Sequence, residues 1–265
     1  MDILIPVITL GALGAVFGAG LAVASKAFAV KIDPRLERIH GLLPGANCGA
    51  CGGAGCFGFA QSLLSGKMPL DSCRVVNDEN KGQIAKILGQ TVEKKTRKVA
   101  VLHCNGGANV KDKYTYSGIK DCIAANSLMQ GPRACSSGCI GFGTCVAVCP
   151  FKALSMSDRG LPIVDIHKCK ACSKCVAACP KKLFSLELVS HPVYVSCASH
   201  ATGKDTKAVC SVGCIGCKLC EKACKFDAIH VKDNLAIIDY HKCTSCKECV
   251  KACPCKTINI RKDAL

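Results

Sequence analysis

Two consecutive cysteine runs of identical spacing constrain this chain more than any other feature of its sequence. Each run reads C-x2-C-x2-C-x3-C, and both lie between residues 210 and 253. Their members are Cys214, Cys217, Cys220 and Cys224 in the first run and Cys243, Cys246, Cys249 and Cys253 in the second. This spacing is typical of chains that hold two [4Fe-4S] clusters, in which the first three thiolates of a run bind one cluster and the fourth binds the other. Zinc is the competing interpretation, but structural zinc more often uses separated C-x2-C or Cys/His pairs.

Cysteine is abundant well beyond these runs, with 25 among 265 residues. In a small secreted protein such a density would indicate disulfides. Here the cysteines stand in close-set runs, which favours metal binding in a reducing compartment. Trp is absent and aromatic residues make up 5% of the chain, so we expect clusters to replace part of a hydrophobic core.

The formal net charge of +16 suits nucleic acid, anionic lipid or an acidic protein as a partner. We find no RRM, helix-turn-helix or zinc-finger pattern and no aromatic platform for bases, so no nucleic-acid partner is expected. We expect the partners of this basic chain to be an acidic redox carrier and the anionic membrane surface. Many individual lysines need no more explanation than a solvated surface.

An apolar run from Ile3 to Ala24 contains no charged residue. At about 1.5 Å per residue it spans roughly 33 Å, which is enough for one bilayer crossing. A cleaved signal peptide is the alternative, but Asp2 stands where a signal peptide carries positive charge, and Lys26 and Lys31 follow the run. We therefore predict a single-pass anchor in the cell membrane, with the amino terminus outside and all the following parts in the cytoplasm.

A glycine-rich segment with four cysteines follows the anchor. Asp33 and Pro34 predict the start of a short helix that ends near Gly41. The next cysteines have the spacing C-x2-C-x4-C-x16-C and are Cys48, Cys51, Cys56 and Cys73. Glycines between ligands allow positive φ and bring backbone N–H groups close to cluster sulfurs. The segment therefore predicts a small module that holds one [4Fe-4S] cluster.

The composition then turns polar, which predicts a linker with some helix around Ile84 and Leu88. It ends in a buried-strand pattern from Val99 to Leu102 that leads to Cys104.

The rest of the chain is an internal duplication. At an offset of 75 residues, Cys135, Cys139, Cys145 and Cys149 align with Cys210, Cys214, Cys220 and Cys224. After a one-residue gap, Cys169, Cys172, Cys175 and Cys179 align with Cys243, Cys246, Cys249 and Cys253. We therefore expect two units of the bacterial ferredoxin type, each a β-hairpin-and-helix sandwich around two clusters.

The two copies differ at one ligand position. Phe142 aligns with Cys217, so the run that begins at Cys139 lacks its middle ligand. Either this site holds a cluster with an open corner, or another cysteine fills it. The nearest candidates are Cys122 and Cys135.

Six cysteines lie outside the nineteen ligands predicted from the runs: Cys104, Cys122, Cys135, Cys197, Cys210 and Cys255. Cys255 follows Pro254, where a ligand run has ended, and is expected to be free. If one of the other five completes the defective site, four remain, which is enough for another cluster. The alternative is that they are buried structural thiols. We therefore expect five clusters, with a sixth as an open possibility, and the counterpart of Cys197 is either Cys104 or Cys122.

Together these patterns predict an α+β protein with one transmembrane helix. The expected order is the anchor (1–30), the single-cluster module (31–75), the linker (76–98) and two ferredoxin-like units (99–190 and 191–265). The sequence has no Ser-His-Asp spacing, P-loop or strand-borne G-x-G-x-x-G, so no complete active site is expected on this chain. It instead predicts an electron relay that belongs to a larger membrane enzyme.

At full length the chain resembles the B subunit of the Rnf complex, the ion-translocating ferredoxin:NAD oxidoreductase. The resemblance rests on the anchor, the segment 33–37 (DPRLE), the segment 43–56 (LPGANCGACGGAGC) and the duplicated ferredoxin region. It implies that the chain accepts electrons from reduced ferredoxin and passes them to membrane partner subunits. A separate subunit would reduce NAD while the complex moves Na+ or H+.

Under this interpretation the basic surface steers an acidic ferredoxin to the carboxy-terminal clusters. The alternatives are a membrane-anchored iron-sulfur subunit of another oxidoreductase, such as a dehydrogenase or hydrogenase, and a redox sensor.

Overall fold

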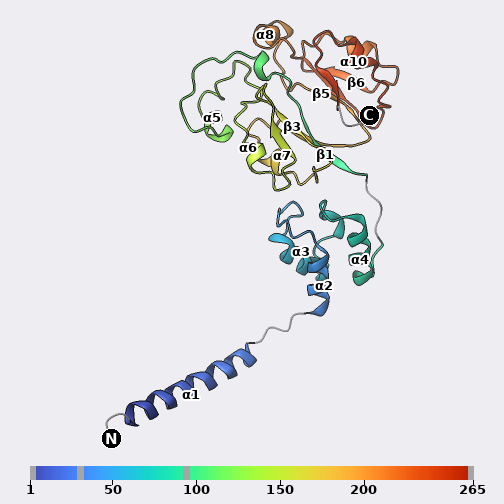
Figure 1. Cartoon of the computed structure of the whole chain (residues 1–265). Helices are drawn as coiled ribbons and strands as arrows, with labels where there is room; N and C mark the ends of the chain where they lie inside the picture. The colour runs from blue at the N-terminus through green and yellow to red at the C-terminus, as the bar shows by residue number, and fades with distance from the viewer. Residues whose placement is uncertain (1–3, 29–32, 92–95, 262–265) are drawn as a thin grey trace.

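The computed structural model describes residues 4–28, 33–91 and 96–261 (Figure 1). Its first helix, α1 (Leu4–Ala27), exposes large apolar side chains between Ile5 and Val23. The stretch Val7–Ala27 has 21 residues and a mean hydropathy of 2.1, so it is long and apolar enough to cross a bilayer. The hydroxyl of Thr9 donates to the carbonyl of Ile5 at 3.0 Å, which satisfies this polar group within the helix.

A small helical module follows, and it contains the predicted short helix. Its elements are α2 (Pro34–Leu42), α3 (Gly55–Leu64), the 3-10 turn η1 (Leu70–Ser72) and α4 (Asp78–Leu88). The prediction for α2 is confirmed, because the helix begins at Pro34 and the Asp33 carboxylate accepts a hydrogen bond from the Arg35 backbone N–H at 2.8 Å.

The core of this module extends beyond the boundary expected from the sequence. Ile39 of α2, Phe59 of α3 and Ile84 of α4 are buried together. The segment predicted as a linker thus contributes α4 to the core. Asn77 caps this helix through the backbone N–H of Asn80, and Gly89 ends it in the left-handed conformation at φ 66°.

Two units of similar topology make up the rest of the described chain. In the first, strands β1 and β4 pair as one antiparallel sheet and β2 and β3 as another. Its elements are β1 (Lys98–Leu102), the 3-10 turn η2 (Gly107–Asn109), α5 (Cys122–Ser127), α6 (Thr144–Ala147), β2 (Leu154–Met156), β3 (Pro162–Val164), α7 (Lys174–Ala178) and β4 (Phe184–Leu188).

The second unit repeats this plan, with β5 pairing with β8 and β6 with β7. Its elements are β5 (Val193–Val195), α8 (Gly203–Val209), α9 (Leu219–Lys222), β6 (Ile229–Lys232), β7 (Leu235–Ile238), α10 (Glu248–Ala252) and β8 (Ile258–Ile260). In both units, therefore, the first and last strands pair with each other, and a central hairpin and three short helices lie between them in the sequence.

Cysteines occupy core positions in both units. Cys145, Cys169 and Cys175 are buried in the core of the first unit, and Cys214 and Cys220 in that of the second. Four short helices, which carry Cys145, Cys175, Cys220 and Cys249, start from residues in the left-handed conformation, namely Gly143, Ser173, Lys218 and Lys247. Three of these four are not glycine, so the ligand loops hold a backbone conformation that side chains disfavour.

Candidate iron-sulfur sites

Four thiols come together in the helical module at what we call the module site, Cys48, Cys51, Cys56 and Cys73. The backbone N–H of Cys56 donates to Asn47 Oδ1 at 2.7 Å, which fixes the loop before α3. Gly55 has φ 79°, and a Cβ there would lie 2.8 Å from that same oxygen. Glycine is therefore needed where this loop turns into the helix.

The second unit holds two four-thiol sites in the cross-over arrangement expected of its runs. Inner site 2 consists of Cys214, Cys217, Cys220 and Cys253, which line one hollow. Outer site 2 consists of Cys224, Cys243, Cys246 and Cys249, which line another. In each site, three thiols of one run meet the fourth thiol of the other.

The first unit repeats the outer site with intact ligands. Outer site 1 consists of Cys149, Cys169, Cys172 and Cys175. Here burial raises the pKa of Cys172, and the nearby thiols of Cys149 and Cys169 raise it further. Burial likewise raises the pKa of Cys175 to about 12, and the charges of Cys169 and Cys172 add to the rise.

Cys122 lies at the site whose run lacks its middle cysteine. Inner site 1 consists of Cys122, Cys139, Cys145 and Cys179, which line one hollow at the start of α5 and α6. The Cys122 backbone N–H donates to Thr144 Oγ1 at 2.7 Å, and this hydroxyl donates to Asp121 at 2.7 Å. Of the two candidates from the sequence, the structure thus brings Cys122 to this corner and places Cys135 elsewhere.

Each cross-over cysteine accepts a hydrogen bond from the backbone N–H four residues later. The donor and acceptor pairs, at 3.3 to 3.5 Å, are Ala153 to Cys149, Leu183 to Cys179, Ala228 to Cys224 and Thr257 to Cys253. Hydrogen bonds to sulfur stabilise thiolate charge and tune cluster potentials.

The donor set and the burial of these thiols fit iron-sulfur clusters. Burial raises the pKa of Cys220 to about 12, with neighbouring thiols adding to it, so the thiolate form needs a bound cation. Zinc would require thiols that converge to about 2.3 Å from one point. Among the described residues no group of three or more His, Cys, Asp or Glu side chains is placed to hold a single metal ion. Four thiols around a hollow are the arrangement that a larger group, such as a four-iron cube, requires.

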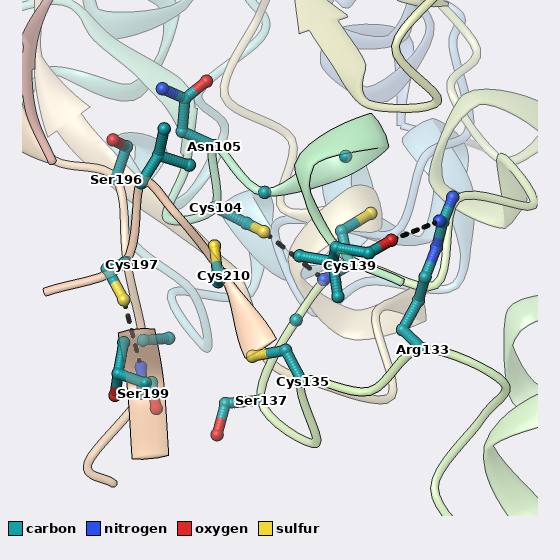
Figure 2. A pocket seen from close by; sticks show the side chains of 18 residues that line it. Cys104, Asn105, Arg133, Cys135, Ser137, Cys139, Ser196, Cys197, Ser199 and Cys210 are labelled. Carbon is teal, nitrogen blue, oxygen red and sulfur yellow. Dashed lines mark hydrogen bonds between the residues drawn. The ribbon is translucent and has the colours of Figure 1, made fainter. Parts of the chain in front are cut away.

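A further four thiols gather in a hollow that the cysteine runs did not predict (Figure 2). This seam site consists of Cys104, Cys135, Cys197 and Cys210, which the sequence offered only as extra ligands. One signal was present, since both Cys135 and Cys210 stand four residues before the first cysteine of a run. Cys255 is outside all six sets and lies beside inner site 2.

The module site lies against the first unit. Cys172 and Phe151 pack on the core of the helical module. The thiols of Cys172 and Cys48 are close enough for the charge on one to raise the pKa of the other. The module site and outer site 1 are therefore neighbours.

Comparisons with known proteins agree with this arrangement. Residues 43–75 match the family "Putative Fe-S cluster", and residues 134–184 and 213–258 match the family "4Fe-4S dicluster domain". The tandem two-cluster domains predicted from the duplication are thereby confirmed.

The chain also has relatives that match along most of their length. It is 44% identical to the B subunit of an ion-translocating oxidoreductase complex from Methanosarcina acetivorans, over 88% of this chain and 89% of the relative. It is 43% identical to the B subunit of the Na(+)-translocating ferredoxin:NAD(+) oxidoreductase complex from Acetobacterium woodii, over 91% of this chain and 73% of the relative. It is 40% identical to the B subunit of the proton-translocating ferredoxin:NAD(+) oxidoreductase complex from Clostridium ljungdahlii, over 87% of this chain and 82% of the relative. The chain therefore belongs to the family of B subunits of the ion-translocating oxidoreductase (Rnf) complex.

Proposed function

We propose that this chain is the electron-relay subunit of its complex, which accepts electrons from reduced ferredoxin and delivers them to membrane partner subunits. The module site and the inner and outer sites of both units would each hold one [4Fe-4S] cluster, which supplies one-electron chemistry when bound. The family favours this function over the dehydrogenase, hydrogenase and redox-sensor alternatives.

The observation that carries the proposal is that Cys48 of the module site and Cys172 of outer site 1 pack on the same core, close enough for the charge on one thiol to act on the other. It makes the module site adjacent to outer site 1. Within the first unit, Cys175 of outer site 1 is in turn close to Cys145 of inner site 1. Adjacent sites are what a relay requires, whereas clusters with a purely structural role have no need to follow one another.

The exposed ligands indicate where electrons enter. All 25 cysteines lie in the part of the chain that the structure describes, and only Cys217 and Cys246 are exposed. Both belong to the second unit. Their counterparts in the first unit are Phe142, which packs on Tyr116, and Cys172, which packs on the helical module. The second unit thus presents the accessible edges to a diffusing ferredoxin.

The membrane end lies at the other extreme of the chain. α1 would cross the bilayer once and leave Lys26, Arg35 and Arg38 on the cytoplasmic side, with the amino terminus outside. The helical module follows α1 in the sequence, so the module site would be the exit toward the membrane subunits.

Rapid mixing of the reconstituted full-length chain with reduced ferredoxin tests the proposal. We expect the visible absorbance of the clusters to bleach, and to bleach markedly more slowly at high than at low ionic strength, because the basic chain attracts an acidic ferredoxin. A rate independent of salt would contradict electrostatic docking. A chain that ferredoxin does not reduce would contradict the relay itself.

A further inference from the structure

We propose that the seam site binds a sixth [4Fe-4S] cluster, which the two ferredoxin-like units hold jointly. Each unit supplies one pair of ligands, Cys104 and Cys135 from the first and Cys197 and Cys210 from the second. Neither unit could complete the site alone. Only the role of this site in electron transfer rests on the proposed function.

The two pairs occupy equivalent positions in the duplicated fold. Cys104 stands two residues after the end of β1, and Cys197 stands two residues after the end of β5. Their partners, Cys135 and Cys210, each begin a segment that reads C-S-x-G-C and leads into an inner site. The structural counterpart of Cys197 is therefore Cys104, and the seam site has approximate twofold symmetry.

Hydrogen bonds to sulfur follow the same symmetry. The backbone N–H of Cys139 donates to Cys104 Sγ at 3.4 Å (Figure 2). In the second unit, the backbone N–H of Cys214 donates to Cys197 Sγ at 3.4 Å. Cys197 also accepts from the N–H of Ser199 at 3.5 Å. These are the same kind of contacts that the cross-over thiols make in the other sites.

The four sulfurs share one hollow. Burial raises the pKa of Cys135, and the thiols of Cys104, Cys197 and Cys210 are near enough to contribute to that rise. Gly106 lies at the wall, where a Cβ would be 3.6 Å from Cys104 Sγ, 3.7 Å from Cys210 Sγ and 2.8 Å from a methyl of Val110. Glycine thus keeps the backbone close to two thiols from different units. All four are free thiols rather than disulfides.

Direct bonds hold the two units in register around the hollow. His103, next to Cys104, donates through Nδ1 to the carbonyl of Val195 at 2.7 Å. Val110 of the first unit forms an isolated antiparallel bridge with Cys210 of the second. These contacts fix the relative positions of the two cysteine pairs.

The seam site lies between the two inner sites. Cys139 of inner site 1 neighbours Cys104, and Cys214 of inner site 2 neighbours Cys197. With a cluster there, the six sites form one row from outer site 2 to the module site. Without it, the row is interrupted at the boundary between the units.

Iron counting on the full-length chain, prepared anaerobically, tests the shared site. We expect about 24 irons and as many acid-labile sulfides in the wild type, at four per cluster. Removing the first unit's pair (Cys104→Ala with Cys135→Ala) should leave about 20 irons, and removing the second unit's pair (Cys197→Ala with Cys210→Ala) should also leave about 20. Removing all four should still leave about 20, because both pairs serve the same cluster.

Several outcomes would overturn the proposal. These are a wild type with about 20 irons, pair variants that retain about 24, or a quadruple variant that loses twice as much iron as either pair. Cys255→Ala is the matched control and should keep the full content. If circular dichroism shows that a pair variant does not fold, the single variant Cys135→Ala replaces it. We expect this variant to show a [3Fe-4S] EPR signal. An iron content equal to that of the wild type, with no such signal, would contradict the site.

The role of the site has a separate readout. Freeze-quench EPR after mixing with reduced ferredoxin should show, in the Cys197→Ala and Cys210→Ala variant, reduced clusters in the second unit and much slower reduction of the remainder. If this variant loses about four irons but its remaining clusters are reduced as fast as in the wild type, the seam site does bind a cluster, but that cluster is not part of the electron path. Because iron content is measured without ferredoxin, a failure of the relay and a failure of the seam site are distinguishable.

Discussion

The ring of Phe142 packs against the ring of Tyr116, with their centroids 5.4 Å apart and their planes at 31°. Phe142 stands where the second unit has the ligand Cys217, and Tyr116 belongs to the loop that leads to α5 and Cys122. Phe142, which stands in place of the missing cysteine, thus packs on the segment that brings Cys122 to inner site 1.

Cys122→Ala should open one corner of inner site 1. We expect a [3Fe-4S] EPR signal and the loss of about one iron per chain, because three thiolates remain. Adding Phe142→Cys to this variant should restore the lost iron, since Cys217 shows that the same position in the fold can supply a ligand. If Cys122→Ala keeps its iron and gives no new signal, Cys122 is not a ligand.

The sequence predicted those features that depend on short-range spacing. A ligand loop such as Cys243 to Cys253 surrounds a cluster within a few residues, so its spacing alone indicates the chemistry. The duplication was equally visible, because corresponding cysteines recur at a nearly constant offset. The short helix α2 was predictable from Asp33 and Pro34, which act on their own backbone.

Features that depend on long-range packing were not predictable in this way. The seam ligands Cys104 and Cys197 follow different strands, and only the docking of the two units brings them together. Cys122 reaches inner site 1 on a separate helix, with no fixed distance from the run it completes. Helix α4 packs through one buried face, whereas the segment around it is polar in composition. The composition therefore predicted a linker where the structure has part of the core.

A buried lysine on α4 should stabilise the module site. Lys81 is only 8% exposed, and its ammonium group lies 2.5 Å from the carboxylate of Asp71, two residues before the ligand Cys73. Lys81→Ala should lower the stability of the module by about 1–3 kcal/mol, less than for a fully buried pair because Asp71 remains partly exposed. The measurement is the rate at which a chelator removes iron from the chain. The control is Lys86→Ala on the same helix, whose side chain is exposed, and equal rates for the two variants would contradict the role of Lys81.

Arg261 should hold the connection between the two units. Its guanidinium Nη2 donates to three carbonyls of that connection, those of Leu188 at 2.7 Å, Val189 at 3.0 Å and His191 at 2.8 Å. Because Arg261 is buried, Arg261→Ala would leave these acceptors without their donor and should cost about 2–4 kcal/mol. Denaturant unfolding followed by cluster absorbance measures the loss, and hydrogen exchange should quicken around residues 188–195. Lys256→Ala, at an exposed lysine five residues earlier in the sequence, should leave the unfolding midpoint and the exchange rates unchanged. An unfolding midpoint of Arg261→Ala equal to that of the wild type would contradict this role of Arg261.

Lys225 should contribute to the attraction of ferredoxin at outer site 2. It directly follows the ligand Cys224 and is exposed, and its charge helps to lower the pKa of Glu248, after the larger effect of Lys251. Lys225→Glu places a negative charge beside the accessible edge of this site, so we expect reduction by an acidic ferredoxin to slow roughly 2- to 5-fold at low ionic strength and to match the wild type at high salt. Lys86→Glu makes the same change in net charge on the helical module and should leave the rate near that of the wild type. Equal slowing by the two variants would mean that ferredoxin responds to the overall charge of the chain, whereas slowing by Lys225→Glu alone places the encounter at the second unit.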